Sequence, residues 1–129
     1  MAAATGGTAA EAFEVSGVAF DSREVTAGDL FIALRGETAD GHAYVPGALA
    51  AGAAGVLVEQ DVDGPCVKVA DTTQALDDLG RASRARTSAT IIGVTGSVGK
   101  TGVKEALFQA FDRMSFGAAH RSLKSYNNH

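Results

Sequence analysis

The chain has 129 residues, of which 46% are hydrophobic, and it carries a formal net charge of −4 and a single cysteine. This length is enough for a hydrophobic core, and the mild acidic charge gives no reason to expect nucleic acid or an anionic membrane as a partner. No apolar stretch is long enough to span a bilayer, and the lone Cys66 excludes an internal disulfide, which fits the reducing cytoplasm.

The first part of the chain predicts a small α/β module of short strands and short helices. Residues 1–10, rich in alanine, glycine and threonine, are expected to form a frayed tail or the remnant of a helix. Pro46 fits the first turn of a short helix over residues 47–51. Alternating or compact apolar runs predict strands, over residues 13–20, 30–34, 56–58 and 66–70. Cys66 opens the last of these runs, so we expect a buried, inert thiol rather than a nucleophile.

A longer helix is predicted after the last of these strands. Asp71-Thr72-Thr73-Gln74 has the spacing of a capping box, with Asp71 as the N-cap and Gln74 at the third helical position. The helix leads into residues 84–88, a polar stretch without apolar periodicity. We therefore predict a first domain over residues 1–85 and a second over residues 86–129.

The second domain opens with the pattern that carries the most chemistry. A β-branched apolar run from Ile91 predicts a strand, a glycine-rich turn follows, and apolar residues at helical spacing then predict a helix to Met114. Strand, glycine loop, Gly-Lys-Thr and helix is the arrangement that holds a nucleoside triphosphate, because glycines let backbone N–H groups converge on phosphate oxygens. The residues of this loop predicted to bind ATP are Thr95, Gly96, Ser97, Val98, Gly99, Lys100, Thr101 and Gly102.

Two side chains in this loop have predicted roles of their own. Lys100 can reach the terminal phosphates, and the Thr101 hydroxyl can ligate Mg²⁺. The strict motif asks for glycine where this chain has Val94, so the loop is a variant. The alternative is a plain strand-to-helix turn with a surface lysine. The chain reaches His129 before any further strand that could complete a parallel sheet, and we therefore expect an N-terminal fragment of a longer enzyme.

The chain resembles the Mur ligases, the ATP-dependent amide-forming enzymes of peptidoglycan synthesis, and the likeness rests on separate stretches. One stretch is Asp21-Ser22-Arg23 with Gly28-Asp29-Leu30-Phe31-Ile32-Ala33-Leu34 and Asp40-Gly41-His42, similar to the family's uridine-nucleotide domain. Another is Gly93 to Thr101 with Val103-Lys104-Glu105, similar to the family's P-loop. The last is Lys124 to His129, which contains a pair of asparagines. Gly102 is a departure, because many relatives carry Thr or Ser there.

The resemblance implies a fold, a reaction and its partners. The fold would be a uridine-nucleotide domain followed by the first βα unit of a P-loop ATPase domain. Within the family, the chain looks most like the branch that adds D-Ala-D-Ala to UDP-N-acetylmuramoyl-tripeptide, with ATP and Mg²⁺ as cofactors. ATP would convert the tripeptide carboxylate into an acyl phosphate that the D-Ala-D-Ala amine attacks, with Lys100 as the catalytic cation. We expect a monomer, and no ligase activity from these residues alone.

The same resemblance assigns residues to the UDP-linked substrate. Ser22 and Arg23 could read the nucleotide through a hydroxyl and a guanidinium, although Asp21-Ser22 could equally cap a turn around a solvated arginine. Asp40-Gly41 is first a tight-turn signal, and His42 alone is more often a packing residue, but the family suggests that Asp40, Gly41 and His42 line the uridine pocket. Asn127 and Asn128 are either turn formers or groups that face the muramoyl-peptide side of the cleft.

Other readings of the sequence remain open. The nearest is the branch of the family that adds the third amino acid to the same precursor. A P-loop kinase or GTPase is a rival from another class, although such enzymes usually open near their first strand. These residues could also bind a uridine nucleotide without turning anything over.

Overall fold

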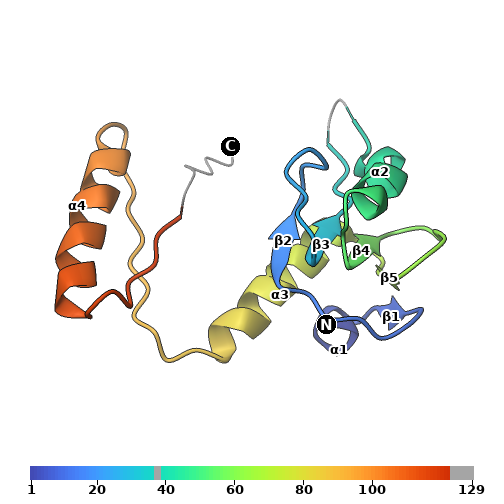
Figure 1. Ribbon diagram of the computed structural model, residues 1–129, viewed down its shortest axis with the longest axis horizontal. Coiled ribbons are helices and arrows are strands. Elements are labelled where there is room, and N and C mark those ends of the chain that lie inside the picture. Colours follow the sequence, from blue (N-terminus) through green and yellow to red (C-terminus); the bar gives the residue numbers. More distant parts are fainter. Residues whose placement is uncertain (37–38, 123–129) are drawn as a thin grey trace. The chain divides into compact units, whose positions relative to one another are not determined.

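The computed structural model describes residues 1–36 and 39–122 and divides the chain into two compact units, Met1–Ser88 and Ala89–His129. The first unit holds a five-stranded sheet with the order β1-β5-β4-β3-β2 (Figure 1). Its strands are β1 (Thr8–Ala9), β2 (Gly17–Ala19), β3 (Asp29–Ile32), β4 (Gly55–Val58) and β5 (Cys66–Lys68). β2 to β5 are parallel to one another, and only β1 pairs in the antiparallel sense, with β5. The α/β fold class expected from the sequence is confirmed.

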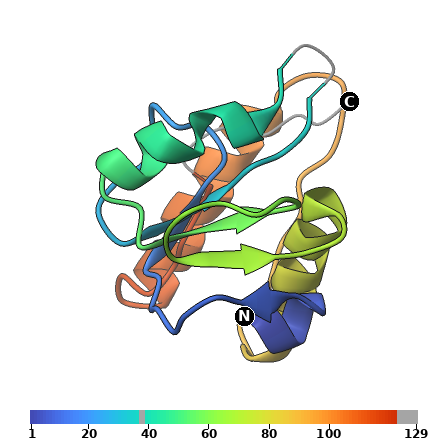
Figure 2. The ribbon, with the colours of Figure 1, turned by 90° about the vertical axis from the view of Figure 1, so that its right-hand side faces the viewer.

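Helices cover both faces of this sheet, as a parallel sheet requires. The helices of the first unit are α1 (Ala2–Thr5), the 3-10 turn η1 (Gly41–Tyr44), α2 (Val45–Ala50) and α3 (Thr72–Ala85). Figure 2 shows the sheet between α2 on one side and α3 with α1 on the other. Both helix layers pack on the sheet through hydrophobic clusters.

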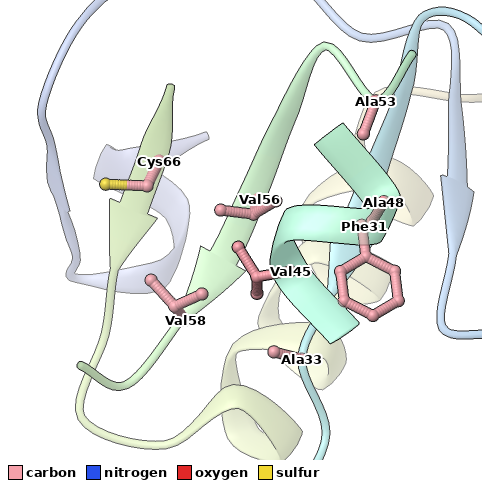
Figure 3. Packing of buried hydrophobic residues seen from close by; sticks show 8 residues of the cluster. All are labelled: Phe31, Ala33, Val45, Ala48, Ala53, Val56, Val58 and Cys66. Atoms are coloured by element: carbon pink, nitrogen blue, oxygen red, sulfur yellow. The ribbon is translucent and has the colours of Figure 1, made fainter. Parts of the chain in front are cut away.

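The side chains of each strand alternate between the two layers. Phe31 and Val56 belong to the cluster that contains α2 residues, and Figure 3 shows them packed around Val45 and Ala48. Leu30 and Leu57, one position away along their strands, belong to the cluster that contains Ala75 of α3. The period of two along a strand therefore divides the core into two halves.

A glycine in the sheet allows a close contact with the segment that precedes β2. A Cβ atom on Gly55 would overlap the Phe13 ring. Phe13 itself packs against the cluster on the α3 side of the sheet. The absence of a side chain at Gly55 therefore makes room for an aromatic ring on β4.

Most elements predicted in the first unit are confirmed with small shifts in their ends. The capping residue Asp71 is confirmed, since its carboxylate accepts hydrogen bonds from the backbone N–H groups of Thr73 (2.8 Å) and Gln74 (2.9 Å). The Gln74 side chain instead donates to Asp78 Oδ1 at 3.1 Å, so the box is not reciprocal. Cys66 is buried, as expected.

Two expectations for the N-terminal part are confirmed only in part. Of the two alternatives for residues 1–10, the helix remnant is confirmed as the four-residue α1, and the frayed tail is wrong, because β1 pairs with β5. The strand expected over residues 13–20 is limited to Gly17–Ala19; the Ser16 N–H still donates to the Gly28 carbonyl at 2.9 Å, and Phe13 and Val15 pack against the core.

The second unit contains α4 (Lys100–Met114), which confirms the predicted helix. The strand predicted from Ile91 is wrong, because residues 89–96 form neither strand nor helix. A strand needs a partner with which to pair its backbone groups, and every strand in the described residues lies in the first unit. Ile91 and Ile92 are accordingly exposed, at 64% and 49%.

Among residues 1–36 and 39–122, no helix combines the length and the apolar character needed to cross a membrane.

Candidate functional site

The carboxyl ends of the parallel strands gather polar side chains at one edge of the first unit. The loop after β2 carries Ser22 and Arg23, and the loop after β3 carries Arg35 and Asp40. Glu59 follows β4 directly. This edge is where open α/β sheets bind their ligands.

The loop after β2 is organised by Asp21. Its Oδ1 accepts a hydrogen bond from the Arg23 backbone N–H at 3.0 Å, and its carboxylate pairs with the Arg23 guanidinium at 2.9 and 2.6 Å. This hydrogen bond and the negative charge of Asp21 raise the pKa of Arg23. The Arg23 side chain is nevertheless 86% exposed, so its guanidinium is accessible to a ligand.

The turn after β3 is organised by Asp40 and His42. Asp40 Oδ1 accepts from the His42 backbone N–H at 2.9 Å and lies 2.6 Å from His42 Nδ1. The backbone hydrogen bond, followed by the side-chain one, lowers the pKa of Asp40. His42 Nε2 accepts the Glu59 backbone N–H at 2.9 Å, so the proton of the neutral ring is on Nδ1 and points at Asp40.

His42 is therefore built into the protein rather than presented to solvent. Its side chain is only 2% exposed, and both ring nitrogens have partners within the chain. Gly41 has a separate constraint, because a Cβ there would come within 2.7 Å of the Leu34 carbonyl oxygen. Asp40, Gly41 and His42 thus fix the shape of the turn beside the sheet edge.

Sequence reasoning missed a second set of contacts at this edge, centred on Glu59. Glu59 Oε1 accepts from the Thr72 backbone N–H (3.0 Å) and lies 3.1 Å from Thr72 Oγ1. Glu59 Oε2 lies 2.8 Å from Arg35 Nε. The available signal was positional, since Arg35 and Glu59 are the polar residues that follow the apolar runs ending at Leu34 and Val58.

Weaker electrostatic effects also act among the charged groups at this edge. Tyr44, in η1, contributes to raising the pKa of Arg23, after the larger effects of Asp21. Arg35 contributes to lowering the pKa of Asp40, after the larger effects of His42. The structure thus brings Arg23, Arg35 and the Gly41–Tyr44 turn to one edge, while the predicted Asn127 and Asn128 lie outside the described residues.

The glycine-rich loop lies in the second unit and leads into the N-terminus of α4. Gly99 is the N-cap residue of α4 with φ 78°, and Gly96 has φ 142°, both in the region that disfavours side chains. Lys100 Nζ donates to the Gly96 carbonyl at 2.5 Å, so the ammonium lies over the loop rather than away from it.

These features fit a phosphate group. A Cβ on Gly99 would meet nothing within 4 Å, so the loop is open on that side, and Ser97, Val98 and Thr101 are exposed. The N-terminus of a 15-residue helix adds partial positive charge there. The residues that the structure describes contain no group of three or more His, Cys, Asp or Glu that could hold a metal ion.

A family model and individual relatives point to the same protein family. Residues 14–86 match the family described as Mur ligase family, catalytic domain. The UDP-N-acetylmuramoyl-tripeptide–D-alanyl-D-alanine ligase of Synechocystis sp. is 41% identical over 123 residues, which is 92% of this chain and 27% of the relative. The UDP-N-acetylmuramoyl-L-alanyl-D-glutamate–2,6-diaminopimelate ligase of Bradyrhizobium diazoefficiens is 40% identical over 114 residues, 86% of this chain and 24% of that relative.

Solved structures give the same result. The chain is similar to MurF from Acinetobacter baumannii, with a TM-score of 0.74 and 35% identity over 88% of this chain and 26% of that one. It is also similar to the MurF ligase from Thermotoga maritima in complex with ADP, with a TM-score of 0.60 and 35% identity over 74% of this chain and 23% of that one. The chain thus spans about a quarter of the length of the relatives that it matches.

Proposed function

This chain belongs to the Mur ligase family, and from that premise we propose that it supplies the nucleotide-binding parts of an ATP-dependent ligase. The ligase adds D-Ala-D-Ala to UDP-N-acetylmuramoyl-tripeptide in peptidoglycan synthesis. The observation that carries this proposal is the 41% identity to a ligase of that name over 92% of the chain, which includes both units. Because ATP is the phosphoryl donor, we place the protein in the cytoplasm, and we propose that it is a monomer.

The first domain, residues 1–85, binds the UDP part of the substrate in this proposal. Ser22 and Arg23 contact the nucleotide from the loop after β2, where the exposed guanidinium can pair with a phosphate. Asp40, Gly41 and His42 hold the adjoining turn in shape, with the buried His42 acting through the backbone it fixes. Asn127 and Asn128 remain proposed contacts on the muramoyl-peptide side.

The second domain, residues 86–129, binds ATP through the loop of residues 95–102. Backbone N–H groups at the start of α4 cradle the phosphates, and Lys100 adds a positive charge that the structure already places over the loop. Thr101 provides a hydroxyl for Mg²⁺. Bound ATP would pass its γ-phosphoryl group to the tripeptide carboxylate and leave as ADP, and the D-Ala-D-Ala amine would then attack the acyl phosphate to form the amide with release of phosphate.

The chain's part in catalysis is to hold charged groups in place. The transferring phosphoryl group and the substrate carboxylate are both anionic, so fixed positive charge and backbone donors lower the cost of bringing them together. Lys100 is the catalytic cation of this chain, because its ammonium would neutralise charge on the terminal phosphates.

Titration of the chain with its two nucleotides tests the proposal. Uridine diphosphate should shift NMR resonances of the loops after β2 and β3, and Mg²⁺-ADP should shift those of residues 95–102. Binding of neither nucleotide would refute the proposal. We also predict that these residues alone do not release phosphate from ATP in the presence of tripeptide substrate and D-Ala-D-Ala, and phosphate release would contradict this expectation.

A second candidate is the ligase that adds the third amino acid to the same nucleotide precursor. The 40% identity to the diaminopimelate ligase of B. diazoefficiens favours it. Phosphate release by a ligase that contains these residues distinguishes the two, because one reaction requires D-Ala-D-Ala and tripeptide precursor and the other requires a diamino acid and dipeptide precursor.

A further inference from the structure

Glu59 joins the ends of three neighbouring elements at the carboxyl edge of the sheet. It directly follows β4, its Oε1 accepts from the first residue of α3, Thr72, and its Oε2 pairs with Arg35 from the loop after β3. Its side chain is only 16% exposed. A carboxylate at this depth needs compensating partners; Thr72 donates to Oε1, and the Arg35 cation pairs with Oε2.

Arg35 is held differently from Arg23. Arg23 pairs with Asp21 inside a single exposed loop, two positions away. Arg35 pairs across two strand ends with a carboxylate that is itself fixed by Thr72, while its own side chain is 59% exposed. The Arg35 guanidinium is therefore anchored at Nε by a fixed group, with the rest of the side chain largely in solvent.

The ion pair itself is a weak source of stability. Pairs with an exposed arginine contribute little, because water screens the charges. Its larger effect is on placement, since the 2.8 Å contact with Glu59 Oε2 holds the guanidinium, with its five N–H donors in a rigid plane, at this strand end. Those donors suit the oxygens of a phosphate.

We propose that Arg35 binds phosphate oxygens of a nucleoside diphosphate at the carboxyl edge of the sheet, and that Glu59 is the positioning residue that aims it. This inference rests on the function proposed above and adds a phosphate-binding residue that the motifs did not identify. Arg35 and Arg23 then approach the diphosphate from the loops that follow β3 and β2.

NMR titrations with two probes, uridine diphosphate and uridine, test the assignment. Arg35→Met keeps the aliphatic stem and removes the charge, and it should raise the Kd for uridine diphosphate roughly tenfold to a hundredfold. The Kd for uridine should stay within about twofold, because uridine has no phosphate. Arg81→Met is the matched control, since Arg81 is an exposed arginine paired with Asp77 on α3, and it should leave both Kd values unchanged.

Glu59→Gln tests the positioning role. It should raise the Kd for uridine diphosphate roughly threefold to tenfold with little effect on uridine, and combining it with Arg35→Met should add nothing to the loss from Arg35→Met alone. A purely structural role would weaken both probes together, and that result would overturn the inference. An Arg35→Met variant that binds uridine diphosphate as well as Arg81→Met does would overturn it too. If the wild-type chain binds neither probe, the proposed function itself fails and the inference falls with it.

Discussion

Replacing Thr72 with valine tests the contacts that join α3 to the sheet edge. Thr72 is 0% exposed, and its Oγ1 lies 3.0 Å from the Ala33 carbonyl oxygen and 3.1 Å from Glu59 Oε1. Valine has nearly the same shape, so the change removes the hydroxyl without opening a cavity. Losing a buried hydrogen bond and leaving its acceptor unsatisfied costs about 2 kcal/mol. The unfolding equilibrium constant should therefore rise roughly thirtyfold.

Urea unfolding followed by far-ultraviolet circular dichroism measures this change, with an unaltered slope as the sign that only stability has changed. Thr73→Val is the matched control, because Thr73 is the exposed next residue of α3 and uses only its backbone N–H to meet Asp71. We expect the control to lie within about 0.5 kcal/mol of the wild type. Equal losses from the two variants, or no loss from Thr72→Val, would refute the reasoning.

Three further predictions concern the two candidate sites. Lys100→Met should weaken ADP binding roughly tenfold to a hundredfold in calorimetric titrations, whereas Arg113→Met, which removes a charge from the last turn of the same helix, should not weaken it. Gly99→Ala should destabilise the start of α4 by about 1–2 kcal/mol, because φ is 78° at this position. Gly102→Ala, inside the helix, should stabilise α4 by about 1 kcal/mol. Amide hydrogen exchange along α4 should therefore be faster in the first variant and slower in the second. The pKa of Asp40 is lowered from 3.8 in the folded state, so its contribution is present above the unfolded-state pKa and is lost as the pH falls through the folded-state pKa. The free energy of unfolding should accordingly fall less steeply with decreasing pH for Asp40→Asn than for the wild type. Equal slopes would contradict a stabilising role of the Asp40 carboxylate.

Elements set by local chemistry could be predicted from the sequence. Asp71 caps α3 because a short carboxylate can reach N–H groups two and three residues ahead, and no distant residue is needed. The buried strands β3 and β4 were predictable because continuous apolar runs of this length require burial on both faces. The helix of the second unit followed from apolar spacing alone.

Features that depend on pairing between distant residues could not be predicted. β1 is two residues long and is a strand only because β5 lies beside it. At Ile91 the composition favours a strand, but no strand forms, because the described residues offer no neighbouring strand with which to pair. Local sequence cannot distinguish these cases, because a strand is stabilised by hydrogen bonds to another segment.

The candidate sites follow the same division. The glycine loop before Lys100 is continuous in sequence, so its pattern was visible. The set of Arg35, Glu59 and Thr72 comes from three separate segments, and only the parallel order of β3, β4 and β5 brings them together. For His42 the sequence left a packing role and a place in the uridine pocket both open, and the fold puts its ring in the interior.

The ring of Phe13 over Gly55 links two positions that are far apart in the chain. Neither can change freely: alanine at 55 would push the ring off the sheet, and a small residue at 13 would leave a void above a bare stretch of backbone. Substitutions that enlarge residue 55 should therefore be tolerated only together with a smaller residue at 13. In natural relatives and engineered variants of this domain, a larger side chain at one of these two positions should occur together with a smaller one at the other.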